Sequence, residues 1–181
     1  MNSPQKYNCD LTIDNPLGFH VRPVQRFAEL AQLFESEITV EIDGREVSGK
    51  SVMGLMSLGG SHGARMQVCS EGSDSKQALE VMRYLVEEDF FVEDSIEKGQ
   101  QVKRHLERIV KLANCFDSEI FFEFNGKKVN AKDHNEVYSI ELSPLDDVEF
   151  EIEGEDAEQA KKVFNKLVRY NFYIEDAVNV D

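Results

Sequence analysis

The 181-residue sequence is poor in cysteine, in basic residues and in long apolar runs. Its three cysteines, Cys9, Cys69 and Cys115, are an odd number and lie far apart. They form neither a C-x-x-C pair nor a metal-ligand spacing with a histidine. We therefore expect small, reduced core residues of a cytoplasmic protein, and the sequence indicates no metal and no other cofactor.

The shortage of basic residues limits the classes of partner. Lys and Arg number 20 against 35 Asp and Glu, a formal net charge of −15. Such a surface repels phosphate backbones and anionic lipid, so neither nucleic acid nor a membrane is expected as a partner. No apolar run approaches the ~20 residues of a membrane span, and residues 1–10 lack the basic and apolar regions of a secretory signal.

What the sequence does contain is an internal repeat. An offset of 82 residues carries Phe34 to Phe116, and at this offset Ser36 and Asp74 recur as Ser118 and Asp156. The register holds along the chain without an insertion, which is the signature of a duplicated unit. We expect two copies of one small domain, residues 1–90 and residues 91–181.

The first copy predicts the element order βαββαβα. Strands, helices and the hairpin turn follow from alternation, helical spacing and capping residues. The residues concerned are Tyr7, Cys9, Leu11 and Ile13 for a strand; Val24, Phe27, Ala28 and Ala31 for a helix that opens at His20; Ile38, Val40, Ile42 and Val47 for a hairpin turning at Asp43-Gly44; Ser51 as the cap of a short helix; Met66 and Val68 for a strand; and Asp74 as the cap of a last helix. This order predicts an α+β fold, an open-faced sandwich in which a four-stranded antiparallel sheet carries its helices on one face.

The second copy repeats this order from about Val102, but the source of its first strand is open. Residues 91–96 could supply it, although this segment also resembles the end of the first copy, since Phe90 recurs as Phe172. The alternating stretch Tyr173, Ile174, Val178 and Val180 is the second possibility.

A histidine, an arginine and a proline stand at the predicted start of the first helix, in the run Gly18-Phe19-His20-Val21-Arg22-Pro23. Free amides and the positive end of the helix dipole favour an anion at this point and disfavour a charged imidazole. A neutral ring can attack phosphorus, Arg22 can hold phosphate oxygens, and Pro23 suits the first turn. This pattern predicts that His20 is transiently phosphorylated.

This run resembles the active-site signature of the HPr family, the histidine phosphocarriers of the bacterial sugar phosphotransferase system. Residues 50–58, Lys-Ser-Val-Met-Gly-Leu-Met-Ser-Leu, resemble the second signature of that family. The resemblance implies that His20 accepts phosphate from Enzyme I, itself charged by phosphoenolpyruvate, and passes it to IIA proteins, with Arg22 stabilising the phosphate. Two positions depart mildly from the family pattern, since Phe19 stands where leucine is commoner and Val21 where a small residue is commoner.

The resemblance also implies a docking patch and a regulatory position. We expect Phe19, Val52, Met53 and Met56 to receive partner proteins beside His20, since flexible thioethers suit surfaces that meet several partners. Ser51 occupies the place of the serine that an HPr kinase phosphorylates in many relatives from Gram-positive bacteria. The simpler interpretation of Ser51 is an N-cap.

The second copy has lost the acceptor. His20 becomes Val102, Ser51 becomes Asp133, and Met56 becomes Tyr138, while Arg22 remains as Arg104. Valine cannot carry phosphate, and His105 stands too far along its helix to replace His20. We therefore expect the second copy to stabilise the first or to bind another protein. Asp133 fits either a fixed negative charge or an acidic N-cap.

The predicted protein is a phosphocarrier rather than a turnover enzyme. The alternative is a regulatory or adaptor protein that uses the HPr-like surface to bind a kinase, a transporter or a transcription factor. An amino-acid-sensing domain of similar topology is the weakest hypothesis. His62, His105 and His134 lack the Gly-His-Arg setting and are expected to be surface residues.

Overall fold

The computed structural model describes residues 5–91, 98–124, 126–140 and 149–172, and the chain divides into two compact units, Met1–Val92 and Glu93–Asp181. Among the helices in these ranges, none is long and apolar enough to cross a membrane. The α+β class predicted from the sequence is confirmed, and each unit is described separately below.

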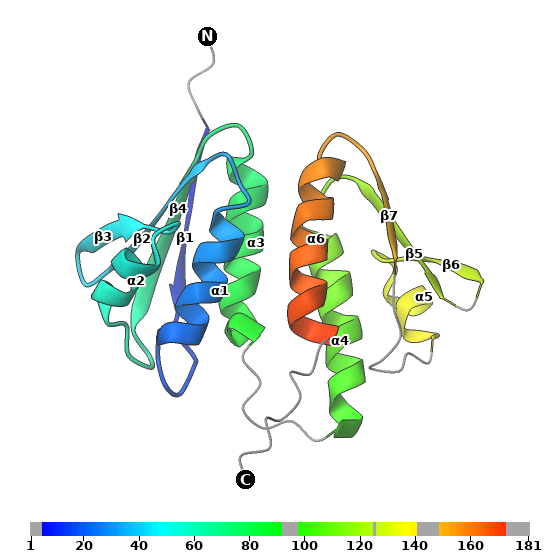
Figure 1. Ribbon diagram of the computed structural model, residues 1–181, viewed down its shortest axis with the longest axis horizontal. Coiled ribbons are helices and arrows are strands. Elements are labelled where there is room, and N and C mark those ends of the chain that lie inside the picture. The colour runs from blue at the N-terminus through cyan, green and yellow to red at the C-terminus, as the bar shows by residue number, and fades with distance from the viewer. Residues whose placement is uncertain (1–4, 92–97, 125, 141–148, 173–181) are drawn as a thin grey trace. The chain divides into compact units, whose positions relative to one another are not determined.

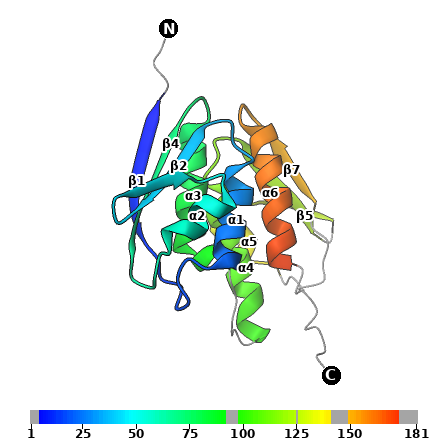
Figure 2. The ribbon, with the colours of Figure 1, turned by 60° about the vertical axis from the view of Figure 1, so that its left-hand side comes forward.

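The first unit has all four strands of the predicted sheet. Its elements are β1 (Lys6–Thr12), α1 (Val21–Ala31), β2 (Glu37–Ile42), β3 (Arg45–Ser48), α2 (Val52–Leu58), β4 (Arg65–Glu71), α3 (Ser75–Glu87) and the turn η1 (Asp89–Phe91). The sheet order is β1-β4-β2-β3, with every neighbouring pair antiparallel. Helices α1 and α3 lie side by side on one face of this sheet (Figure 1), and Figure 2 shows α2 beside α1.

Alternation places the core of the first unit between the sheet and its helices. Ile38, Val40 and Ile42 of β2 are buried, while the residues between them are half-buried. The hairpin turns where predicted, because Asp43 has φ 51° and Gly44 has φ 75°. Positive φ at both central residues is the geometry of a type I′ turn, which matches the twist of the two strands.

The second unit has three strands among its described residues. Its elements are α4 (Lys98–Ala113), β5 (Glu119–Phe124), β6 (Lys127–Asn130), α5 (His134–Tyr138), β7 (Phe150–Glu153) and α6 (Ala157–Phe172), with sheet order β6-β5-β7. The first candidate for its first strand, residues 91–96, begins with Phe91, but Phe91 lies in η1 and so belongs to the first unit. Residues 92–97 and 173–181, which hold the rest of both candidates, lie outside the described residues.

The first helix of the second unit begins earlier than the repeat predicts. At the repeat offset α1 would start at residue 103, but α4 starts at Lys98. Pro16 and Gly18, which keep the corresponding segment of the first unit out of a helix, are replaced by Lys98 and Gln100. Leu17 becomes Gly99, which lies inside α4. A proline costs a helix roughly 3 kcal/mol and a glycine about 1 kcal/mol, so the loss of Pro16 outweighs Gly99 and the loop of the first unit becomes helix in the second.

One aspartate in each unit joins two loops in the same way, and here the capping prediction was wrong in detail. Asp74 occupies the N-cap position of α3 but makes no side-chain cap bond there. Its carboxylate instead accepts from the amides of Glu35 and Ser36, at 2.8 and 2.9 Å, and from the Ser36 hydroxyl. Asp156 makes the equivalent bonds to Asp117 and Ser118. In the first unit Asp74 joins the loop before α3 to the loop before β2. In the second unit Asp156 joins the loop before α6 to the loop before β5.

Replacing Asp74 by Asn is expected to destabilise the first unit in a pH-dependent way. Burial acts to raise the pKa of Asp74, but hydrogen bonds from Ser36 and the two amides lower it below its ordinary value of 3.8. A depressed pKa contributes stability that is present above that ordinary value and is lost as the pH falls through the folded-state pKa. We expect Asp74→Asn to lose about 1–3 kcal/mol at pH 7, a typical contribution of charged hydrogen bonds.

Urea unfolding of the full chain at pH 7 and at pH 3 measures this effect. The wild type should lose more stability than Asp74→Asn on acidification, because the variant has no carboxylate to protonate at this site. Asp156→Asn serves as the control, since it should affect the transition of the second unit. Equal acid-induced losses for wild type and Asp74→Asn would contradict the assignment.

Candidate functional site

The candidate site is built on the loop between β1 and α1. This loop contains a turn at residues 15–18. The Asn15 side chain accepts a hydrogen bond from the Leu17 amide at 2.9 Å, and the Asn15 carbonyl accepts one from the Gly18 amide at 2.8 Å. Gly18 has φ 71°, and an added Cβ would lie 2.5 Å from the Gly60 carbonyl oxygen. Only glycine fits this close approach and this backbone conformation, which bring the next residues to the end of α2.

His20 stands at the start of α1, as predicted. It is the N-cap, with extended backbone (φ −86°, ψ −173°), and its carbonyl accepts from the Val24 amide at 3.0 Å. Its side chain makes no cap hydrogen bond, and the first turn of α1 contains no acidic residue. The ring is half-buried, and its Nε2 is buried without a hydrogen-bond partner among the described residues. The positive end of the helix is therefore not occupied by a carboxylate of the first turn.

Arg22 and Pro23 take the positions that the sequence predicts. Arg22 is exposed in the first turn of α1, two residues after His20, and Pro23 is buried in the same turn. Pro23 has no amide hydrogen, and its ring fits the first turn of a helix without loss of a hydrogen bond. The turn thus places an exposed arginine at the same end of the helix as the imidazole.

The prediction that Phe19 belongs to a docking surface was wrong. Phe19 is only 4% exposed. Its ring lies edge-on to Phe27, with centroids 6.0 Å apart, and stacks with Phe90 at 5.3 Å. Its amide donates to the Gly60 carbonyl at 2.7 Å. A large aromatic beside a functional residue contributes most when it is buried, and Phe19 anchors the loop to the core.

The exposed large apolar side chains of the described chain all lie close in sequence to His20 or on α2. Met53 is 80% exposed and Met56 37%, as expected of docking residues, whereas Val52 is half-buried. Sequence reasoning missed Leu17, 69% exposed, and Val21, 52% exposed. The signal was available, because Leu17 stands between a proline and a glycine and Val21 occupies the first helical position. We call Leu17, Val21, Met53 and Met56 the apolar patch.

Ser51 is the N-cap of α2, and its hydroxyl accepts from the Gly54 amide at 3.1 Å. In the second unit, Asp133 caps α5 and accepts from the amides of Asn135 and Glu136 at 2.8 and 3.1 Å. The capping bonds account for an acidic residue at Asp133 in full, so no mimicry of phosphoserine is needed to explain it.

The second unit does not rebuild the His20 site. Val102, at the place of His20, is the fifth residue of α4 rather than an N-cap. Arg104 and His105 lie further along the same helix. Tyr138 takes the place of Met56 and is half-buried; burial, followed by a hydrogen bond to Glu107, raises its pKa to about 12. Both the helix end and the apolar patch are therefore lost.

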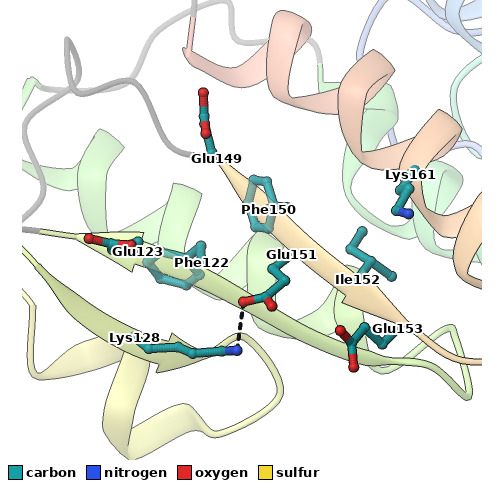
Figure 3. A pocket seen from close by; sticks show the side chains of 9 residues that line it. All are labelled: Phe122, Glu123, Lys128, Glu149, Phe150, Glu151, Ile152, Glu153 and Lys161. Carbon is teal, nitrogen blue, oxygen red and sulfur yellow. Dashed lines mark ion pairs between the residues drawn. The ribbon is translucent and has the colours of Figure 1, made fainter.

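A pocket of about 520 Å³ lies in the second unit beside β7 (Figure 3). Lys128 and Glu151 form an ion pair of 2.6 Å across it. None of the predicted site residues lines it; the lining is Phe122, Glu123, Lys128, Glu149, Phe150, Glu151, Ile152, Glu153 and Lys161. Four of these nine side chains are glutamates, so the pocket does not offer phosphate a favourable site.

The remaining candidate ligands do not converge. Within the described ranges, no group of three or more His, Cys, Asp or Glu side chains could hold a metal ion. His62 and His134 are exposed, as predicted, and the side chain of His105 lies outside the description. The three cysteines are free but half-buried rather than core residues. Burial raises the pKa of the Cys9 thiol to about 11, which makes it a poor nucleophile.

The family model described as "PTS HPr component phosphorylation site" matches residues 7–88 and again residues 102–169. The chain belongs to the HPr family. Both matched segments together exceed half of the chain, so the duplication inferred from the sequence is confirmed at the level of the family.

Individual relatives each match over about the length of a single HPr protein. The phosphocarrier protein HPr of Borreliella burgdorferi is 43% identical over 70 residues, which are 39% of this chain and 81% of that protein. The HPr-like protein Crh of Bacillus subtilis is 39% identical over 72 residues, 40% of this chain and 85% of that protein. Among solved structures, HPr of Thermoanaerobacter tengcongensis is 38% identical and covers 48% of this chain and 98% of its own, with a TM-score of 0.47.

Proposed function

We propose that the first unit is a phosphocarrier that accepts a phosphoryl group on His20 and passes it to a second protein. The observation that carries this proposal is a half-buried imidazole at the N-terminus of α1, with Arg22 exposed in the same turn and no acidic residue there. Backbone amides and the guanidinium supply the positive charge that a transferred phosphoryl group requires.

The geometry favours one ring nitrogen. Nε2 of His20 is buried, so an incoming phosphoryl group cannot reach it from solvent. We infer that Nδ1 is the nitrogen that attacks phosphorus. As the new N–P bond forms, the bond from phosphorus to the donor breaks, and the phosphoryl oxygens keep their negative charge. Arg22 and the first-turn amides would stabilise that charge on either side of the transfer.

The apolar patch supports transfer between proteins. Two of its exposed apolar side chains, Leu17 and Val21, lie within three residues of His20, and the other two lie on α2, which packs against α1; such a group is unusual in a chain with a net charge of −15. Such patches on soluble proteins mark docking sites. By membership of the HPr family, the partners we propose are Enzyme I as donor and IIA proteins as acceptors, in the cytoplasm.

A regulatory role is the second candidate, and two observations favour it. The second unit lacks an acceptor, and relatives of this chain include HPr-like proteins named Crh. Phosphorylation of Ser51 by an HPr kinase would add about two negative charges two residues from Met53 in the apolar patch. That charge would oppose docking of the carrier partners.

Incubation with Enzyme I and phosphoenolpyruvate tests the proposal. The wild type should acquire one phosphate that is stable to base and labile to acid, and His20→Ala should acquire none, because no other described histidine lies at a helix N-cap beside an arginine. His62→Ala is the matched control and should be labelled like the wild type. Label on His20→Ala at the wild-type rate would refute the assignment.

A further inference from the structure

The first unit ends in a turn with an unusual backbone. Asp89, Phe90 and Phe91 of η1 have φ values of 54°, 54° and 55°, in the left-handed region. This conformation costs a residue with a side chain roughly 1–2 kcal/mol. Phe90 is nevertheless fully buried. Three such residues in succession persist only where surrounding contacts determine the conformation.

Helix α1 provides one of these contacts. Nη1 of Arg26 donates to the carbonyl oxygen of Phe90 at 2.8 Å and also to that of Phe91. Charge-assisted bonds to carbonyl oxygens are stronger than bonds between neutral groups. The turn is therefore held by the same helix whose N-cap is His20.

The ring of Phe90 provides the second contact. It stacks with Phe19 at a centroid distance of 5.3 Å and an interplanar angle of 29°. Phe19 directly precedes His20, and its amide is bonded to Gly60. Phe90 thus packs against Phe19, the residue directly before the N-cap of α1.

The His20 ring depends on such packing. No hydrogen bond from a described residue holds its buried Nε2, and its side chain does not cap α1. The position of the imidazole is consequently set by the backbone at residues 19 and 20 and by the side chains packed behind them. A shift of Phe19 would be passed directly to the neighbouring residue.

We propose that Phe90 is a positioning residue for His20, acting through Phe19 and held in place by Arg26. The inference rests on the proposed function, since it assigns the purpose of the contact to phosphoryl transfer. Removal of part of the Phe90 ring should loosen Phe19 and leave the imidazole less well aligned for attack. Misplacement of a reacting group by about 1 Å can lower a rate by orders of magnitude.

The test compares Phe90→Leu with Phe91→Leu in the full chain. Phe91 is a suitable control because it is also buried and loses the same atoms, but its ring packs on Tyr84 at 5.4 Å rather than on Phe19. Both variants should lose similar stability in urea. Only Phe90→Leu should lower kcat for phosphorylation by Enzyme I, by roughly tenfold, with KM unchanged because the apolar patch is intact.

A second measurement separates this inference from the proposed function. In Phe90→Leu the NMR resonances of the His20 ring should shift or split, whereas in Phe91→Leu they should match the wild type. If the wild type takes no phosphate but the ring resonances respond as expected, the proposed function fails and the positioning contact stands. Equal kcat values or equal spectra for the two variants would overturn the positioning role.

Discussion

A chain carrying both His20→Ala and Val102→His should be phosphorylated by Enzyme I and phosphoenolpyruvate at less than one-hundredth of the wild-type rate. Restoring the histidine does not restore the helix end. His20 caps α1, but residue 102 is the fifth residue of α4, whose amide and those that follow are bonded within the helix. The new imidazole would meet no free amides.

Phosphorylation of this double variant is measured by the same labelling assay, with circular dichroism to show that both units are folded. The single variant Val102→His is the control and should carry one phosphate, on His20. Two phosphates on the single variant, or one on the double variant, would show that the second unit retains a working site and would contradict the account of its loss.

Substitution of Met53 by Glu should lower kcat/KM for phosphorylation by about 10- to 100-fold. Met53 is 80% exposed, so its substitution removes little from the folded core. Burial of one methionine against a partner contributes about 1.5–3 kcal/mol, and each 1.4 kcal/mol is a factor of ten in affinity. The loss should fall mainly on KM, since the charge weakens docking and leaves His20 untouched.

The second unit supplies a matched control for this variant. Asn135 occupies the equivalent position on α5 and is exposed, so Asn135→Glu adds the same charge to the corresponding helix. It should leave kcat/KM at the wild-type value. A similar loss for both substitutions would indicate a general effect of charge, and no loss for Met53→Glu would remove α2 from the docking surface.

The sequence predicted the parts of the site that depend on local chemistry. His20 at a helix start, the type I′ turn at Asp43-Gly44 and the Ser51 cap follow from backbone preferences that act over a few residues. The 82-residue repeat also identified two copies, because one register relates both. The element order of the first unit followed from these local signals together.

Features that depend on tertiary contacts were missed. Nothing in the local pattern shows that Phe19 turns inward, since its burial depends on Phe90, 71 positions away in the chain. Asp74 has the appearance of a cap, yet its carboxylate binds a loop nearly forty residues earlier. Leu17 and Val21 were overlooked because exposed apolar residues disrupt the very periodicity that identifies a helix or strand.

The early start of α4 at Lys98 has a signal in the local sequence. The replacement of Pro16 and Gly18 by Lys98 and Gln100 removes the proline that opposes a helix most strongly, which outweighs the gain of Gly99 in the place of Leu17. The repeat itself hid this signal, because alignment of the two copies suggests the same boundary in each. These replacements therefore place Val102, the residue equivalent to His20, inside a helix rather than at its N-cap.

The most direct test of the central claim follows labelled phosphate through the wild-type protein. Enzyme I and labelled phosphoenolpyruvate charge the protein, the phosphorylated residue is mapped by mass spectrometry at alkaline pH, and a IIA protein is then added. The account predicts label on His20 that leaves for the IIA protein. Label that settles on any other residue, or none at all, would contradict it.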